Sequence, residues 1–195
     1  MNDKLRDLLD MDKYERRGAY HWTKYAQEKE CKKFTDKVLD YFLSIEPNTG
    51  QDILEVGCGD GLWIHLIGEK GYDIRGIDAN ELAIKLGKEK GLENISHSFL
   101  LDYTNKHDVC IMFDVFEHFE EPEKSVDKLT EIINERIYIL NPEFESKYHH
   151  DYYTTSTIES LFNKDWKLAH DTTLTGRSNA TKSPFTKGFL QFTKK

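Results

Sequence analysis

Glycine occupies every second position from 57 to 61 in the stretch EVGCGDG, residues 55–61, which ends an apolar run. Gly57, Gly59 and Gly61 would allow unusual backbone angles and the close approach of a ligand. Backbone N–H groups at the start of a following helix can hold a carboxylate. The spacing matches neither the G-x-G-x-x-G fingerprint of dinucleotide sites nor the P-loop, and no lysine follows it. The stretch therefore predicts a ligand-binding turn of a different kind.

An acid follows these glycines at the end of a second apolar run. Asp78 closes the stretch GYDIRGID, seventeen positions after Gly61. A carboxylate at the end of a strand can accept two hydrogen bonds from a ribose diol. Together the glycines and the acid indicate a nucleoside that carries a small carboxylate more readily than one that carries a pyrophosphate. The structural alternative is a tight turn, with Asp78 as the cap of a helix.

The elements that must position these residues follow from the hydrophobic periodicity. A first helix is predicted over residues 31–45, and short apolar strands then alternate with helices of roughly ten residues. This alternation is typical of a parallel sheet with right-handed crossovers. The predicted strands cover residues 52–57, 72–78, 94–100, 108–114 and 136–141, and the predicted helices that separate them cover 62–70, 81–90 and 122–134.

The C-terminal part of the chain has a different pattern. A helix is predicted over residues 156–163, followed by strands over 166–174 and 184–194 and a polar turn over 175–183 between them. This hairpin would add an antiparallel edge to the sheet. We therefore predict an α/β fold: a Rossmann-like, doubly wound, seven-stranded sheet that is mostly parallel, with an antiparallel C-terminal hairpin and helices on both faces.

Length and composition limit the further options. The 195 residues suit a single domain over 1–195, with an N-terminal cap or lid and first helix over 1–49 and an α/β core over 50–195. A net charge of -8 disfavours nucleic acid and anionic membranes as partners. The three cysteines have no CxxC spacing, and no apolar run approaches the roughly 18 residues that span a bilayer. We expect a cytoplasmic protein, with monomer and homodimer both open.

The residues described first resemble the class I S-adenosylmethionine-dependent methyltransferases, whose first motif is E/D-x-G-x-G-x-G and whose second strand ends in an acid. The resemblance covers roughly residues 50–142. It implies S-adenosylmethionine as cofactor and S-adenosylhomocysteine as product. The cofactor residues that it implies are Glu55, Gly57, Cys58, Gly59, Asp60 and Gly61 at the methionine end, Asp78 and Ala79 at the ribose, Asp102 on the adenine side, and Phe113 and Trp22 beside the cofactor.

A second motif follows the fourth predicted strand. The stretch FDVFEHFEEPEKS resembles the D-V-x-E-H-x-x-x-P segment of small-molecule methyltransferases of the ubiquinone-biosynthesis type. Histidine has an unperturbed pKa of about 6.5, which suits it to take a proton from an acceptor hydroxyl. The catalytic candidates are His118 and Glu117, with His149 and His150 from a later cluster. The alternative for His118 is a hydrogen bond to Glu117 or to the backbone.

The residues of this second motif and of the later histidine cluster could also form a metal site. Asp114, Glu117, His118 and His149 would offer oxygen and imidazole ligands to a divalent cation. The set loosely resembles that of the metal-dependent methyltransferases that modify the 2′-oxygen at small-RNA 3′ ends. The first position here is aspartate rather than glutamate, and the stretch HHDYYTTST matches the later motif only in part. We therefore do not expect a bound metal, and a polar substrate loop is the alternative.

The N-terminal region adds aromatic and basic residues. Tyr20, His21, Trp22 and Tyr25 interrupt a charged stretch, either as a lid over the site or as an anchor of the first helices. Basic side chains at Arg16, Arg17, Lys24 and Arg177 could bind an anionic acceptor, but they do not by themselves select a substrate.

The leading expectation is methyl transfer from S-adenosylmethionine to an oxygen, in preference to a nitrogen, of a small metabolite or sugar-like acceptor. One alternative is metal-assisted 2′-O-methylation of RNA 3′ ends. Another is a cofactor-binding module without catalysis. The spacing of the glycines disfavours a dehydrogenase. The identity of the acceptor stays open.

Overall fold

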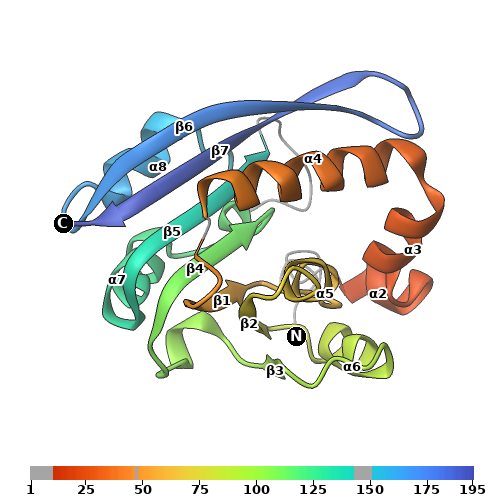
Figure 1. Cartoon of the computed structure of the whole chain (residues 1–195), viewed down its shortest axis with the longest axis horizontal. Coiled ribbons are helices and arrows are strands. Elements are labelled where there is room, and N and C mark those ends of the chain that lie inside the picture. Colours follow the sequence, from red (N-terminus) through yellow and green to blue (C-terminus); the bar gives the residue numbers. More distant parts are fainter. Residues whose placement is uncertain (1–10, 47, 143–150) are drawn as a thin grey trace.

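A seven-stranded sheet forms the centre of the protein (Figure 1). The computed structural model describes residues 11–46, 48–142 and 151–195. The strand order is β3-β2-β1-β4-β5-β7-β6, with β1 to β5 parallel and β7 antiparallel to both of its neighbours. The strands are β1 (Asp52–Val56), β2 (Asp73–Asp78), β3 (Ile95–His97), β4 (His107–Phe113), β5 (Ile133–Pro142), β6 (Trp166–Arg177) and β7 (Pro184–Lys194). The predicted mostly parallel sheet with an antiparallel hairpin is confirmed.

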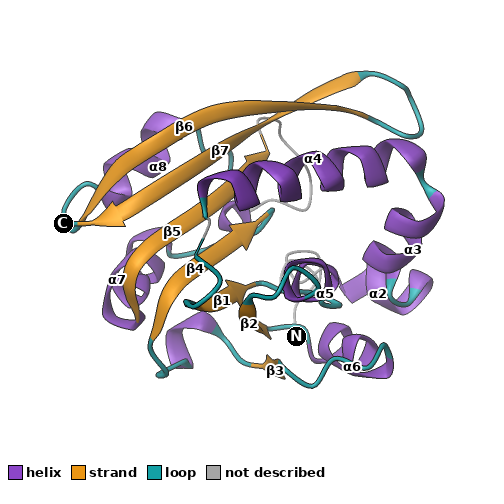
Figure 2. Ribbon diagram, in the orientation of Figure 1, coloured by secondary structure: helices purple, strands orange, loops and turns teal. Residues whose placement is uncertain are grey.

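Helices cover both faces of this sheet (Figure 2). They are α2 (Met11–Arg17), α3 (Tyr20–Gln27), α4 (Lys29–Ile45), α5 (Leu62–Gly68), α6 (Glu81–Glu89), α7 (Pro122–Ile132) and α8 (Thr155–Phe162), with short 3-10 helices η1 (Leu100–Asp102) and η2 (Phe116–His118). Within the described part of the chain, no helix is both long and apolar enough to cross a membrane.

Neighbouring residues of each central strand pack into two separate hydrophobic cores, one on each face of the sheet. Ile53 packs with α4 and α5, whereas the next residue, Leu54, packs with α7 and α8. The same alternation recurs in β4, where Ile111 and Cys110 join opposite cores. Side chains of a strand point alternately to its two faces, so an uninterrupted apolar run is what a strand buried on both faces requires.

Three strands differ from their predicted bounds by three residues at one end, and the other predicted elements differ by smaller amounts. β3 ends at His97 instead of residue 100, because the chain turns after the hydrogen bond from Ser98 N to Asp78 O and forms η1. β5 starts directly after α7. β6 continues through Gly176 into the predicted turn, and a Cβ on Gly176 would lie 2.5 Å from the Phe185 ring and 2.6 Å from the Phe34 ring. This glycine therefore allows the extended hairpin to pack against α4.

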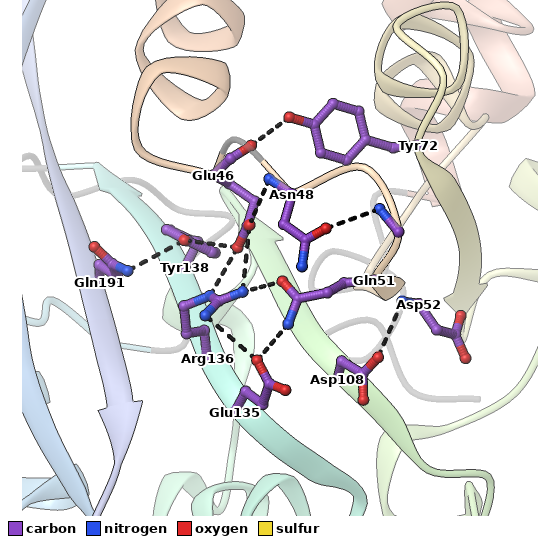
Figure 3. Close-up of polar contacts among 11 residues, drawn as sticks. Glu46, Asn48, Gln51, Asp52, Tyr72, Asp108, Glu135, Arg136, Tyr138 and Gln191 are labelled. Carbon is purple, nitrogen blue, oxygen red and sulfur yellow. Dashed lines mark hydrogen bonds and ion pairs between the residues drawn. The ribbon is translucent and has the colours of Figure 1, made fainter.

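A buried polar cluster ties the end of α4 to β5, near the amino ends of β1 and β4 (Figure 3). Glu46 is 1% exposed. Its carboxylate accepts hydrogen bonds from Arg136 Nε at 2.8 Å and from Tyr138 Oη at 2.9 Å. Gln191 Nε2 in turn donates to Tyr138 Oη at 3.2 Å. The cluster fixes the direction of α4, whose other end reaches over the carboxyl edge of the sheet.

Candidate ligand-binding site at the carboxyl edge of the sheet

The glycine loop (residues 57–61) joins β1 to α5 and has a left-handed backbone at each of its three glycines, with φ of 71°, 55° and 78°. A Cβ on Gly57 would lie 2.5 Å from the side chain of Val115. A Cβ on Gly59 would lie 2.3 Å from Tyr14 Oη. The loop therefore needs glycine for its backbone angles and for close contact with α2 and the segment after β4.

Asp78 holds the glycine loop through its side chain. Its Oδ2 accepts a hydrogen bond of 2.7 Å from Gly59 N, and its Oδ1 accepts one of 2.7 Å from Asn80 N. The Asn80 side chain caps α6 by accepting from Ala83 N at 3.1 Å. Asp78 thus orients the loop, whereas Asn80 rather than Asp78 is the helix cap.

Glu55 is a buried acid behind the loop. It is 1% exposed, and its Oε2 has no hydrogen-bond partner among the described residues. Burial raises the pKa of the Glu55 carboxyl well above its usual range, and the negative charges of Asp78 and Asp60 act in the same direction. A ligand cation that reached this carboxyl would satisfy the oxygen and favour its ionised form.

A cavity of about 1170 Å³ opens between the glycine loop, the segment after β4 and the N-terminal helices. Ligand pockets commonly measure about 300–1,000 Å³, so this cavity is larger than a typical pocket for one ligand. The predicted cofactor residues that line it are Glu55, Gly57, Cys58, Gly59, Asp78, Ala79, Asp102 and Phe113. Asp60, Gly61 and Trp22 do not line it.

Asp60 connects the glycine loop to α3. It is 0% exposed, and its Oδ2 accepts a hydrogen bond of 3.0 Å from His21 N. The Nδ1 atom of His21 lies 3.1 Å from Asp60 Oδ1. Trp22 Nε1 donates to Asp60 O at 2.8 Å, and the Trp22 ring packs on His65. These contacts favour an anchoring role for Trp22, while Tyr20 and His21 also line the cavity.

The acceptor candidates lie in the segment that follows β4. Glu117 and His118 belong to η2 and line the cavity, with 3.9 Å between His118 Nε2 and Glu117 Oε1. Asp114 precedes them and forms an ion pair with Lys187 of β7. His149 and His150 lie outside the described residues. Among the predicted acceptor and metal residues, the described ones that line the cavity are therefore Asp114, Glu117 and His118.

The predicted metal ligands do not assemble into a metal site within the described ranges. No group of three or more His, Cys, Asp or Glu side chains there has the arrangement to hold a metal ion. The fourth predicted ligand, His149, is outside these ranges.

Sequence reasoning missed Tyr14, Phe185 and Lys187, all of which line the cavity. One signal for Lys187 is present in the sequence. Phe185, Lys187 and Phe189 alternate along β7 and share one face of the strand, and Phe189 belongs to the core beneath α4. A lysine in such an inward-facing row indicates a polar site beside the core.

The family model and the curated relatives that match this chain are all methyltransferases. A family model described as a methyltransferase domain matches residues 22–171. The chain is 24% identical over 135 residues to a ubiquinone biosynthesis O-methyltransferase of Nitrosospira multiformis, covering 65% of this chain and 56% of that protein. The same enzyme of Bordetella avium is 22% identical over 130 residues, covering 62% of this chain and 54% of the relative. The chain thus spans about half the length of these curated relatives.

Solved structures share the fold. Magnesium protoporphyrin IX methyltransferase from Synechocystis PCC 6803, with bound S-adenosylmethionine, has a TM-score of 0.75 at 17% identity and covers 100% of both chains. The N-methyltransferase NodS from Bradyrhizobium japonicum WM9, in complex with S-adenosylhomocysteine, has a TM-score of 0.67 at 13% identity, covering 87% of this chain and 90% of the other. At these identities the likeness extends to the fold alone.

Proposed function

The chain belongs to the methyltransferase domain family, and we propose that it transfers a methyl group from S-adenosylmethionine to an oxygen of a small metabolite or sugar-like acceptor. The observation that carries this proposal is the buried carboxyl of Glu55, whose Oε2 is unpartnered beside the glycine loop. That arrangement fits the amino acid end of the cofactor, because an ammonium and a carboxylate need an acid and backbone N–H donors respectively.

When bound, S-adenosylmethionine supplies a methyl group on a positively charged sulfur. Glu55 accepts hydrogen bonds from the ammonium of its amino acid end, and the first N–H groups of α5, at Leu62 and Trp63 in the cavity wall, serve the carboxylate. Asp78 accepts from the ribose hydroxyls. A carboxylate has about four acceptor sites, so Asp78 can serve the ribose as well as Gly59 N and Asn80 N.

The remaining cofactor contacts come from the cavity walls. Asp102 of η1 lies on the adenine side, and the ring of Phe113 packs beside the cofactor. Phe113 is itself held by Trp63, at 5.0 Å between ring centroids. Rigid aromatic support of this kind keeps a wall in place, which matters because methyl transfer depends strongly on the alignment of the reacting atoms.

His118 acts on the acceptor. Its imidazole takes the proton from the acceptor hydroxyl, and the neighbouring Glu117 carboxylate favours the imidazolium that forms. Both residues line the same cavity as the glycine loop. Support for an oxygen acceptor comes from this pairing, since a hydroxyl benefits from a base with a pKa near neutrality.

Calorimetric titration with S-adenosylhomocysteine tests the cofactor assignment, with NADH as the control ligand. Micromolar binding of S-adenosylhomocysteine and no binding of NADH are expected. Absence of S-adenosylhomocysteine binding would defeat the proposal. Formation of S-adenosylhomocysteine in the presence of hydroxyl-bearing acceptors then separates a methyltransferase from a module that binds the cofactor without turnover.

A further inference from the structure

Lys187 places a charged amine in the wall of the cavity, on the acceptor side. Its Nζ pairs with the carboxylate of Asp114 and lies 5.5 Å and 5.9 Å from the ring centroids of Phe34 and Phe185. The Lys187 side chain is 13% exposed. The contacts come from the residue after β4, from α4 and from β7, so they hold the ammonium in a defined position despite the flexibility of a lysine side chain.

The two rings beside Lys187 pack edge to face and form an apolar part of the cavity wall. The centroids of Phe34 and Phe185 are 4.9 Å apart at an interplanar angle of 71°, and both residues line the cavity. Gly176 leaves the space that this pair occupies. A planar ligand ring can stack on the face of one of these rings and pack edge to face with the other, which favours a planar ligand.

Two further cations line the same part of the cavity. Lys24 and Arg177 form no salt bridge with any described residue. Burial raises the pKa of the Cys31 thiol, and Lys24 and Lys187 both oppose that shift, so both ammonium groups lie near Cys31. We call Lys24, Arg177 and Lys187 the cationic rim. Glu28 also lines the cavity there and offsets part of its charge.

Asp114 lies between Lys187 of the cationic rim, with which it forms an ion pair, and Phe113, beside which the cofactor is expected to bind. It follows Phe113, the last residue of β4, and has a left-handed backbone with φ of 60°. A non-glycine residue in this region is strained, and such strain is concentrated at functional sites. The ion pair with Asp114 keeps Lys187 close to the carboxyl end of β4.

We propose that the cationic rim binds the anionic group of a planar acceptor, with Lys187 as the residue that determines specificity. The inference rests on the proposed function and names the class of its acceptor: a planar organic carboxylate that also carries the hydroxyl to be methylated. The acceptor ring packs on Phe34 and Phe185, and its carboxylate replaces Asp114 as the partner of Lys187. Lys24 and Arg177 add attraction without the loss of an existing ion pair.

Binding to the protein saturated with S-adenosylhomocysteine tests this assignment. The probes are hydroxynaphthoate, its neutral carboxamide and its cationic aminomethyl analogue, which share a planar ring and differ in charge. Hydroxynaphthoate is expected to bind most tightly. Lys187→Gln should weaken hydroxynaphthoate binding by about tenfold or more, the size of one lost charged hydrogen bond. Lys167→Gln, at an exposed position of β6 outside the cavity, is the matched control.

Asp114→Asn supplies a readout that a merely structural role of Lys187 would not produce. The substitution removes the internal competitor for the ammonium, so affinity for hydroxynaphthoate should rise. Asparagine also tolerates the left-handed backbone at this position. Affinity for S-adenosylhomocysteine should stay the same in both variants.

Three results would overturn the inference: no binding of hydroxynaphthoate to the saturated protein, equal binding of hydroxynaphthoate and its carboxamide, or tightest binding of the aminomethyl analogue. The last result would assign the rings and Asp114 to a cationic acceptor. If the unaltered protein fails to bind S-adenosylhomocysteine, the proposed function itself fails, and the acceptor assignment falls with it.

Discussion

His21 and Asp60 join the N-terminal helices to the glycine loop through two contacts with one carboxylate. The backbone N–H of His21 donates to Oδ2 at 3.0 Å, and His21 Nδ1 lies 3.1 Å from Oδ1. Asp60 is completely buried. The loop on which the cofactor is expected to bind is therefore also the surface on which α3 docks, so docking of α3 and ligand binding should be coupled.

Removal of this carboxylate should release α3. In Asp60→Ala the amide hydrogens of residues 20–27 should exchange faster, because the substitution removes a buried hydrogen-bond acceptor worth roughly 1–3 kcal/mol. S-adenosylhomocysteine should bind more weakly. Hydrogen exchange with mass spectrometry measures the first effect and calorimetry the second. Thr23→Ala, on the exposed side of α3, is the control, and unchanged exchange in Asp60→Ala would contradict the coupling.

Asp78→Ala should weaken S-adenosylhomocysteine binding by roughly 10- to 100-fold, because the ribose loses its acceptor and the Gly59 N–H loses the partner that orients the loop. Calorimetry measures the change. Asp73→Ala alters the exposed acid at the opposite end of the same strand and should bind normally. Equal affinity in the two variants would remove Asp78 from the cofactor site.

Glu55 should give the ligand-free protein a pH-dependent stability. Its pKa is raised in the folded state by burial and by neighbouring acids. The folded state therefore holds the proton more tightly than the unfolded chain, whose carboxyl titrates near pH 4.3. The stability that this provides is fully present below the unfolded pKa and is lost as the pH rises through the folded pKa. Glu55→Gln should thus raise the melting temperature more at pH 8 than at about pH 4.

The same residue should release a proton when the cofactor product binds, because the ligand ammonium favours the ionised carboxylate. Titrations of S-adenosylhomocysteine in buffers of different ionisation enthalpy should therefore give different apparent enthalpies. Glu55→Gln should abolish that difference, whereas Glu89→Gln on the surface of α6 should retain it. A binding enthalpy independent of buffer in the unaltered protein would show that Glu55 does not change its protonation.

His118→Ala should lower kcat by about 10²- to 10⁴-fold, the usual contribution of a general base, while affinity for S-adenosylhomocysteine is retained. The rate of S-adenosylhomocysteine formation with a working acceptor, measured against pH, provides the test. His170→Ala, on the exposed part of β6, should behave like the unaltered protein. A matching loss of kcat and cofactor affinity in His118→Ala would instead assign His118 to the cofactor site.

Arg136→Ala should destabilise the fold by about 3 kcal/mol or more, because it leaves the buried Glu46 carboxylate without its cation. Chemical denaturation measures this loss. Arg75→Ala breaks ion pairs with Asp52 and Asp73 in which the arginine side chain is 46% exposed, and should cost about 1 kcal/mol or less. Similar losses in both variants would mean that the buried cluster does not hold α4 to β5.

The sheet could be predicted from the sequence because each central strand is buried on both faces. Its sequence is therefore a short apolar run between turns. β1 and β4 follow this pattern closely. The predicted bounds of the two edge strands were less accurate. β3 pairs on one side only, and β6 is lengthened because its far end packs against α4. At an edge, pairing and tertiary packing decide where a strand ends.

The sequence by itself determined the positions that a local chemical requirement specifies. The three glycines are required by left-handed backbone angles. Glu55 and Asp78 lie at the ends of strands that the hydrophobic periodicity predicts. The functional roles of these residues, and of His118, stay predictions for the measurements above.

Only the tertiary structure decided which distant side chains meet around the cavity. Asp60 binds His21 from another element, and Asp114 pairs with Lys187 on a strand added much later in the chain. Tyr14 rather than a ligand explains part of the need for glycine at position 59. Periodicity records which face of an element is buried, but strand order and helix direction determine what lies opposite that face. These long-range contacts therefore have no local signature beyond an unexpected charge, such as Lys187, in an inward-facing row.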